Sequence, residues 1–191
     1  MMPPARAPDL VRPVIGFRQW RLRGSELWAL LSDERWDPGV VTARCDTGRH
    51  QAPETDCECG LYAWYEPPNP MASAATADLV AGGVALWGRI ELHAHGMRAE
   101  HGMVVALALP LSWGSKRRRL RAAAERLGAP AVPVWRLKAT ALHHGELIPP
   151  AMRPPDTTTN LRAQPFPPDP ARLHAAIDGY PPGGEKTGNT G

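Results

Sequence analysis

Apolar and polar residues alternate most regularly between residues 84 and 93, which read VALWGRIELH. This two-residue period is typical of a strand with one buried and one polar face. A turn at His95 and Gly96 then leads into a second apolar run, MRAEHGMVVALAL, over residues 97–109. We therefore predict a long antiparallel hairpin. Its buried face on the first strand consists of Val84, Leu86, Ile90 and Leu92.

Five shorter runs are rich in branched and aromatic residues and are bounded by turn residues, which is typical of strands. They are residues 14–22, 26–31, 40–45, 61–66 and 131–137. Because Pro133 cannot donate a ladder hydrogen bond, we expect the last of these strands at an edge of the sheet.

Two segments carry helix signals. The Asn-Pro pair at 69–70 suits an N-cap and a first helical position, so we predict a helix over 71–80 that the Gly-Gly pair at 82–83 terminates. A second helix, over 115–127, begins with Ser115 as its cap. Its apolar stripe consists of Leu120, Ala123, Ala124 and Leu127.

The order of these elements predicts a single α+β domain with a central antiparallel sheet and two to three short helices. A chain of 191 residues is long enough for one core and short for two. We place the domain at residues 10–148, after a flexible N-terminus at 1–9. Ten of the last 43 residues are proline and five are glycine, so residues 149–191 are predicted to form a disordered tail with at most a short helix over 170–177.

The composition limits the classes of protein to which this chain can belong. No segment approaches the roughly 20 apolar residues of a membrane span, and the N-terminus lacks the apolar core of a signal peptide. We therefore expect a cytoplasmic protein without membrane association, whose thiols stay reduced. The net charge of +3 is too small to identify a partner.

All three cysteines lie in one short segment with a histidine between them, in the order Cys45, His50, Cys57 and Cys59. Three thiols and one imidazole are a standard ligand set for zinc, and four protein ligands leave no open position for catalysis. The intervening residues are polar and lack hydrophobic periodicity, so a structural Zn2+ would give this loop a reason to be ordered. Two other interpretations stay open, namely a redox pair of Cys57 and Cys59, or incidental thiols with Cys45 buried in its strand.

The motif ARC…H.AP…C.CGLYAW, followed downstream by VALWGRIELHAHGMRAE, resembles small actinobacterial proteins with no established activity. That group shares a cysteine and histidine loop ending in C-x-C-G-[IL]-Y-A and a downstream hairpin ending in R-A-E. The similarity covers about residues 14–135 of this chain. It implies that the shared pattern falls on Cys45, His50, Cys57, Cys59, Gly60, Tyr62, Ala63, Trp87, Gly88, Arg89, Arg98 and Glu100.

A second polar group lies on the predicted hairpin. Glu91, His93 and His95 alternate along one strand, as paired metal ligands do in several enzymes, and Arg98 and Glu100 follow on the return strand. A metal-dependent enzyme using residues 91–100 is therefore one alternative function. The other interpretation is a solvated sheet face with His95 in the turn and cross-strand ion pairs. Those pairs are Arg89–Glu100 and Glu91–Arg98.

The predicted helix at 115–127 starts with a basic cluster. It comprises Lys116, Arg117, Arg118 and Arg121. Arginines in this position can contact phosphate, so a nucleic-acid-binding protein is a second alternative, although a charged run is also typical of a solvated helix face. Over both alternatives we favour a small, non-catalytic, zinc-stabilised interaction module with a protein partner.

Overall fold

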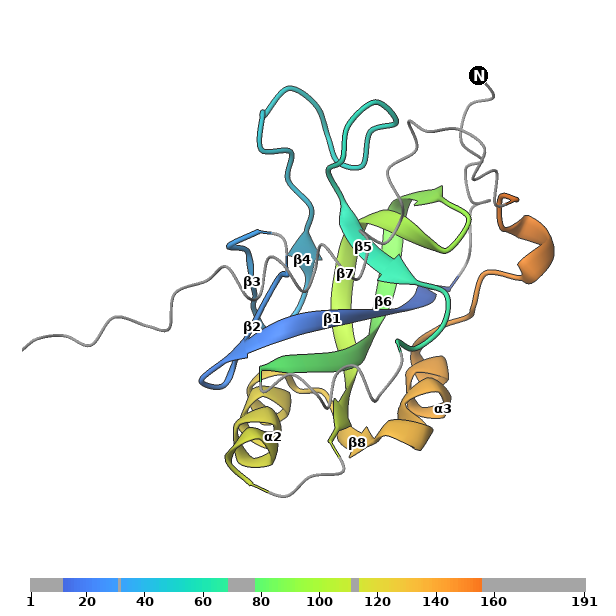
Figure 1. Cartoon of the computed structure of the whole chain (residues 1–191). Coiled ribbons are helices and arrows are strands. Elements are labelled where there is room, and N and C mark those ends of the chain that lie inside the picture. Colours follow the sequence, from blue (N-terminus) through green and yellow to red (C-terminus); the bar gives the residue numbers. More distant parts are fainter. Residues whose placement is uncertain (1–11, 31, 69–77, 111–113, 156–191) are drawn as a thin grey trace, which may run out of the picture.

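The computed structural model describes residues 12–30, 32–68, 78–110 and 114–155. Within these ranges eight strands form one mixed sheet with helices packed beside it, which confirms the α+β prediction (Figure 1). The strands are β1 (Val14–Arg23), β2 (Glu26–Trp28), β3 (Arg35–Trp36), β4 (Val41–Thr42), β5 (Leu61–Trp64), β6 (Leu79–Leu92), β7 (Gly96–Leu109) and β8 (Ala131–Pro133). The helical segments are α2 (Ser115–Leu127), α3 (Leu137–Ala141) and the 3-10 turns η1 (Val134–Arg136), η2 (Leu142–His144) and η3 (Pro150–Met152).

Four of the strands close into a ring. β1 and β7 each pair antiparallel with both β6 and β5. Phe17 of β1, for example, pairs with Gly83 of β6 on one side and with Trp64 of β5 on the other. β2 and β3 extend the sheet from β1, while β4 and the parallel strand β8 pair with β7. Because closure leaves little unpaired backbone on these strands, the ring is a firm support for the loops attached to it.

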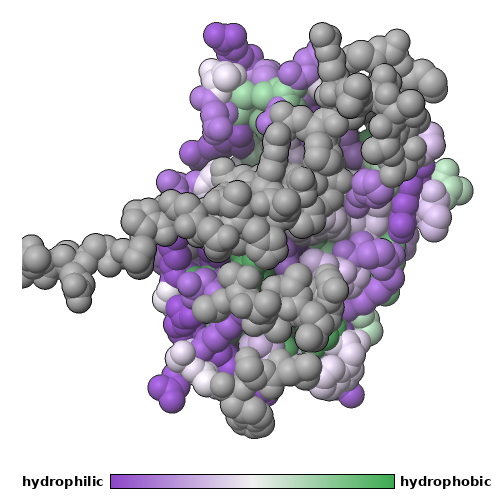
Figure 2. All heavy atoms as spheres, viewed as in Figure 1, coloured by the Kyte–Doolittle hydropathy of each residue, from purple (hydrophilic) through white to green (hydrophobic). Residues whose placement is uncertain are grey.

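Two apolar clusters stabilise this arrangement. The larger one takes side chains from all four ring strands and includes the fully buried Trp20 and Trp36, whose rings meet edge to face with centroids 5.3 Å apart. The smaller one includes Leu137 and Ala141 of α3 together with Phe17 of β1. Where the coloured atoms are visible in Figure 2, the surface is mostly hydrophilic with small, separate hydrophobic patches, as expected when the apolar residues are gathered inside.

Helix α2 packs on the larger cluster with the stripe that the sequence predicts. Its buried residues are Leu120, Ala123, Ala124 and Leu127. The helix ends at Gly128, whose φ of 66° is the left-handed conformation of a glycine C-cap. Ser115 is the first helical residue rather than the cap, because Gly114 occupies the N-cap position.

The predicted hairpin is present as β6 and β7, but β6 begins earlier than expected. The helix prediction for 71–80 is wrong at residues 79 and 80, which belong to β6, and its residues 71–77 lie outside the described ranges. Gly82 and Gly83 lie inside the strand instead of ending a helix. The reason for glycine at position 82 is tertiary: a Cβ there would be 2.5 Å from the Ala106 carbonyl oxygen and 2.9 Å from the Trp20 ring.

The last predicted strand is also shorter than expected. Only Ala131–Pro133 is extended, as β8, which pairs with β7 alone among the described strands; residues 134–137 are helical. Leu137 and Ala141 are four residues apart, a spacing that puts both on the same helix face and into the smaller cluster. At the C-terminal side, the described fold continues through η3 to residue 155, beyond the predicted domain limit at 148. The rest of the predicted tail, 156–191, and the N-terminal segment 1–9 lie outside the described ranges.

Replacing Gly82 with alanine should test this packing. We expect Gly82→Ala to lower the free energy of unfolding by about 1–3 kcal/mol, because the new methyl group must displace backbone or the buried Trp20 ring. Urea denaturation of the full chain measures the change. Ala122→Ser, at an exposed position of α2, is the control, and an equal effect of the two substitutions would contradict the packing explanation.

Candidate metal centre

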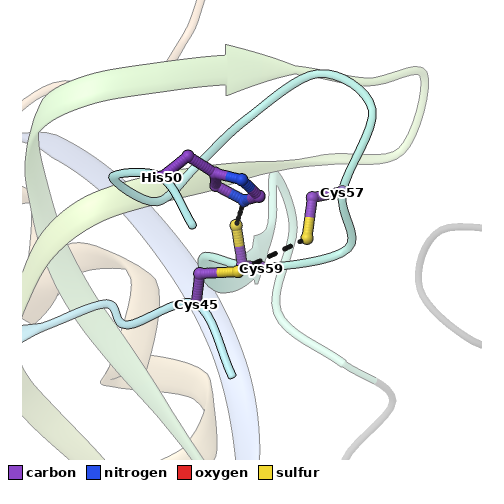
Figure 3. Close-up of side chains that lie close together, drawn as sticks. All are labelled: Cys45, His50, Cys57 and Cys59. Atoms are coloured by element: carbon purple, nitrogen blue, oxygen red, sulfur yellow. Dashed lines mark hydrogen bonds between the residues drawn. The ribbon is translucent and has the colours of Figure 1, made fainter. Parts of the chain in front are cut away.

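The four residues singled out by their spacing meet in the loop between β4 and β5 (Figure 3). The Sγ atoms of Cys45, Cys57 and Cys59 and a ring nitrogen of His50 all lie within 4.8 Å of one another. The Cys45 and Cys57 sulfurs are 3.8 Å apart, and His50 Nε2 is 3.3 Å from Cys59 Sγ. Two sulfurs bound to one tetrahedral zinc ion at about 2.3 Å are about 3.8 Å apart. These four side chains can therefore hold a metal ion with little movement.

Pairing along β7 brings the two ends of this loop together. β5 pairs with residues 96–99 of β7, and β4 pairs with residues 101–102 of the same strand. Between them, the Ala43 amide donates to the Glu100 carbonyl at 2.7 Å. The strand before Cys45 and the strand after Cys59 are thus held end to end along one edge of β7, which keeps the loop closed at its base.

Local turns then orient the ligands within the loop. The Gly48 amide donates to the Cys45 carbonyl at 2.9 Å, and the Cys57 amide donates to the Glu54 carbonyl at 3.0 Å. Gly60 has a φ of 131°, and a Cβ at this position would lie 3.0 Å from the Cβ of Arg98. A residue without a side chain lets the chain pass close over β7 as it enters β5.

The three thiols differ in how readily they ionise. A hydrogen bond from the Thr47 hydroxyl, whose oxygen is 3.0 Å from the sulfur, lowers the pKa of Cys45 to about 7. Burial raises the pKa of Cys59 to about 11. Metal ions bind the thiolate form, so a bound cation would supply the charge that stabilises Cys59 as an anion.

Arg98 of β7 fastens the loop to the sheet. Its Nη1 donates to the carbonyl of Cys57 and, at 3.3 Å, to that of Cys59, while its Nη2 donates to the Glu54 carbonyl at 3.4 Å. Nη2 also donates to the carboxylate of Glu91. Arg98 is therefore bonded to the backbone of two of the four candidate ligands, from beneath the loop.

Glu91, His93 and Arg98, which were predicted to belong to a polar cluster on the hairpin, thus support the loop from inside the fold. The cross-strand pair of Glu91 and Arg98 exists, but both residues are buried, so the predicted solvated face is wrong for them. His93 Nε2 accepts a hydrogen bond from Arg98 Nε at 3.2 Å. Burial, together with the positive charge of Arg98, lowers the pKa of His93 to about 4, so its imidazole is neutral at pH 7.

The remaining members of that cluster lie nearer the surface. The Arg89 guanidinium faces Glu54 of the loop at 3.6 Å, and its backbone amide, rather than its side chain, donates to the Glu100 carboxylate at 3.1 Å. Glu100 also accepts a hydrogen bond from Gln51 of the loop. His95 lies in the turn between β6 and β7, as predicted. The hairpin and the loop are therefore joined by several polar contacts that sequence spacing did not reveal.

The basic cluster of α2 is separate from the metal-binding residues. In Figure 1 the loop lies at the top of the molecule and α2 at the bottom. Arg118 and Arg121 are exposed, whereas Lys116 and Arg117 are half-buried. Burial lowers the pKa of Lys116. The structure does not bring these side chains together with the cysteines into one site.

Within the described ranges, no helix has the length and apolar character needed to cross a membrane. No protein-family model, no curated protein and no solved structure matches this chain.

Removing the Arg98 side chain should both loosen the loop and lower the stability of the whole fold. We expect Arg98→Met to lower the free energy of unfolding by about 3–5 kcal/mol, because Glu91 would be left as a buried, unpaired charge. Adding Glu91→Gln should recover part of that loss. Chemical denaturation of both variants measures these changes.

Arg89→Met is the matched control, because Arg89 contacts the same loop from a more exposed position. We expect it to change the free energy of unfolding by less than about 1 kcal/mol. Equal effects of the Arg89 and Arg98 substitutions would show that burial of the Arg98–Glu91 pair does not stabilise the loop.

Proposed function

We propose that this protein is a non-catalytic interaction module whose loop, residues 43–60, is held by a structural Zn2+ bound to Cys45, His50, Cys57 and Cys59. The observation that carries the proposal is the convergence of four metal-binding atoms within 4.8 Å in a segment that has no helix or strand of its own. Strand pairing along β7 and Arg98 hold the base and the inner side of this segment, and a bound ion would crosslink the four side chains themselves.

The chemistry of the donors supports zinc. Thiolate and imidazole ligands suit Zn2+ far better than Mg2+ or Ca2+, which prefer oxygen. Three thiols and one imidazole fill a tetrahedron, so no position is left for a reacting water or substrate. Arg98 and Thr47 would supply the outer hydrogen bonds that orient ligands in many metal sites.

The outer surface of the loop supports binding of a protein. Its exposed side chains carry both signs of charge: Arg44, Asp46, Arg49, Asp56 and Glu58. A fixed backbone that presents mixed charges can bind a partner with little loss of conformational entropy.

The hairpin enzyme is less well supported. It would use His93, His95 and Glu100 as ligands or general bases, but His93 accepts a hydrogen bond from the buried Arg98, and the Glu100 carboxylate accepts hydrogen bonds from Gln51 and from the Arg89 backbone amide. Using His93 and Glu100 in this way would break contacts that join the hairpin to the loop.

Elemental analysis of the purified chain tests the metal. We expect about one equivalent of zinc per chain and less than about 0.1 equivalent in Cys57→Ala, because three ligands hold a structural ion much more weakly than four. His93→Ala is the control and should retain about one equivalent. A chain without stoichiometric metal would contradict the proposal, and metal that survives Cys57→Ala but is lost in His93→Ala would favour the hairpin enzyme.

Limited proteolysis tests the role of the metal in holding the loop. Trypsin cleaves after Arg44 and Arg49, both exposed in the loop. We expect chelator treatment to raise cleavage at these sites by roughly tenfold or more, since an unclamped loop opens more often. Cleavage after Arg118, exposed on α2, should change little by comparison. Unchanged cleavage in the loop after complete zinc removal would show that the metal does not fix it.

A further inference from the structure

Two large apolar side chains are exposed on one continuous helical run, formed by η1, α3 and η2 over residues 134–144. Among the described residues, Trp135 is 69% exposed and Leu142 37%. In Figure 1 the α3 part of this run lies at the bottom of the molecule, opposite the loop. An exposed tryptophan is unusual enough to need an explanation, because it is among the residues most enriched in binding hot spots.

Trp135 and Leu142 are seven residues apart, which is close to two turns of either an α-helix or a 3-10 helix, so this spacing puts them on the same side of the run. Ala139, four residues after Trp135 and three before Leu142, is also exposed. The run thus presents an apolar stripe with a large side chain at each end and a small one between them, which we call the Trp135 face.

The backbone beneath the Trp135 face is firmly seated. Leu137 and Ala141 point the other way and are buried in the smaller apolar cluster. Ala141 packs so closely on β6 that a Cβ at Gly83 would lie 2.8 Å from its methyl group. Lys138 adds an ion pair with Glu66 at 2.6 Å. The exposure of Trp135 is therefore a property of a fixed surface, and binding there would cost little backbone entropy.

The ionised side chains on the run itself are basic. Residues 134–145 contain no aspartate or glutamate, but they include Arg136, Lys138, His143 and His144. Arg136 and both histidines are exposed, while Lys138 is paired with Glu66, and Glu146, just after the run, is paired with Arg12 at 3.5 Å. A ligand for this surface should therefore combine an apolar side chain that packs on Trp135 with a carboxylate that meets the Arg136 guanidinium.

We propose that the Trp135 face binds an acidic segment of a partner protein through an aromatic or aliphatic anchor. The proposal rests on the proposed function as an interaction module, but it places a binding surface on α3 and its flanking turns instead of on the zinc loop. The exposed indole supplies contact area, and the Arg136 guanidinium selects against basic partners.

A peptide library can test this surface without knowledge of the natural partner. Random peptides of about a dozen residues, displayed on phage, would be selected on the immobilised full chain, and enriched peptides would be measured by fluorescence polarisation. We expect the enriched sequences to carry several Asp or Glu residues around an aromatic or leucine residue. Trp135→Ala should weaken their binding by at least about tenfold and Leu142→Ala by less, because Trp135 offers the larger and more exposed apolar side chain. Raising the salt concentration should also weaken binding.

Val40→Ala is the matched control, because Val40 is 59% exposed but lies outside the Trp135 face; we expect less than about a twofold change. Trp135→Phe should keep part of the affinity, and circular dichroism would verify that each variant is folded.

Lack of enrichment for acidic peptides, or binding that survives Trp135→Ala, would overturn the proposal. So would a Trp135-dependent dimer in sedimentation, or Trp135-dependent binding to vesicles of phosphatidylcholine and phosphatidylglycerol. The zinc content is measured independently. Peptide binding by a chain without zinc would refute only the metal-based function, whereas a chain that binds zinc but no peptide would refute only this proposal.

Discussion

A buried guanidinium joins the sheet to the loop, and the rest of the candidate site depends on it. Arg98 of β7 and Glu91 of β6 face each other across the hairpin, away from water. Burying such a pair is costly unless its remaining hydrogen-bonding groups are satisfied. The carbonyls of Glu54, Cys57 and Cys59 satisfy them. The loop therefore covers the ion pair, while the ion pair in turn fixes the backbone of two cysteines.

This mutual dependence explains how four side chains of one polar loop, Cys45, His50, Cys57 and Cys59, can converge without a helix or strand between them. Pairing of β4 and β5 along one edge of β7 closes the base of the loop, and Arg98 holds its far side. A metal ion bound to the three thiols and His50 would fix the remaining part of the loop. The ring of β1, β6, β7 and β5 thus supports the loop at one end of the molecule and α3, which directly follows η1 with its exposed Trp135, at the other.

Local patterns identified the parts of this structure that depend on local contacts. The alternation over residues 84–92 predicted the hairpin strand, the stripe of α2 its buried face, and the spacing of Cys45, His50, Cys57 and Cys59 their close approach, and all three are observed. The polar face expected on that strand is not, because β6 is buried on both faces over most of its length. The predictions failed where contacts between residues far apart in the sequence determine the structure. Gly82 looks like a helix terminator, but it is small because Trp20 packs against it. Arg98 looks like a surface residue of a hairpin, and only the fold of residues 54–59 over it reveals that it is buried.

The central claim concerns which atoms surround the metal, and X-ray absorption at the zinc edge of the purified full-length chain addresses it most directly. The account predicts three sulfur neighbours at about 2.3 Å and one nitrogen neighbour at about 2.0 Å, in four-coordinate geometry. A spectrum dominated by oxygen and nitrogen neighbours, or one with fewer than three sulfurs, would contradict the Cys3His centre on which the account rests.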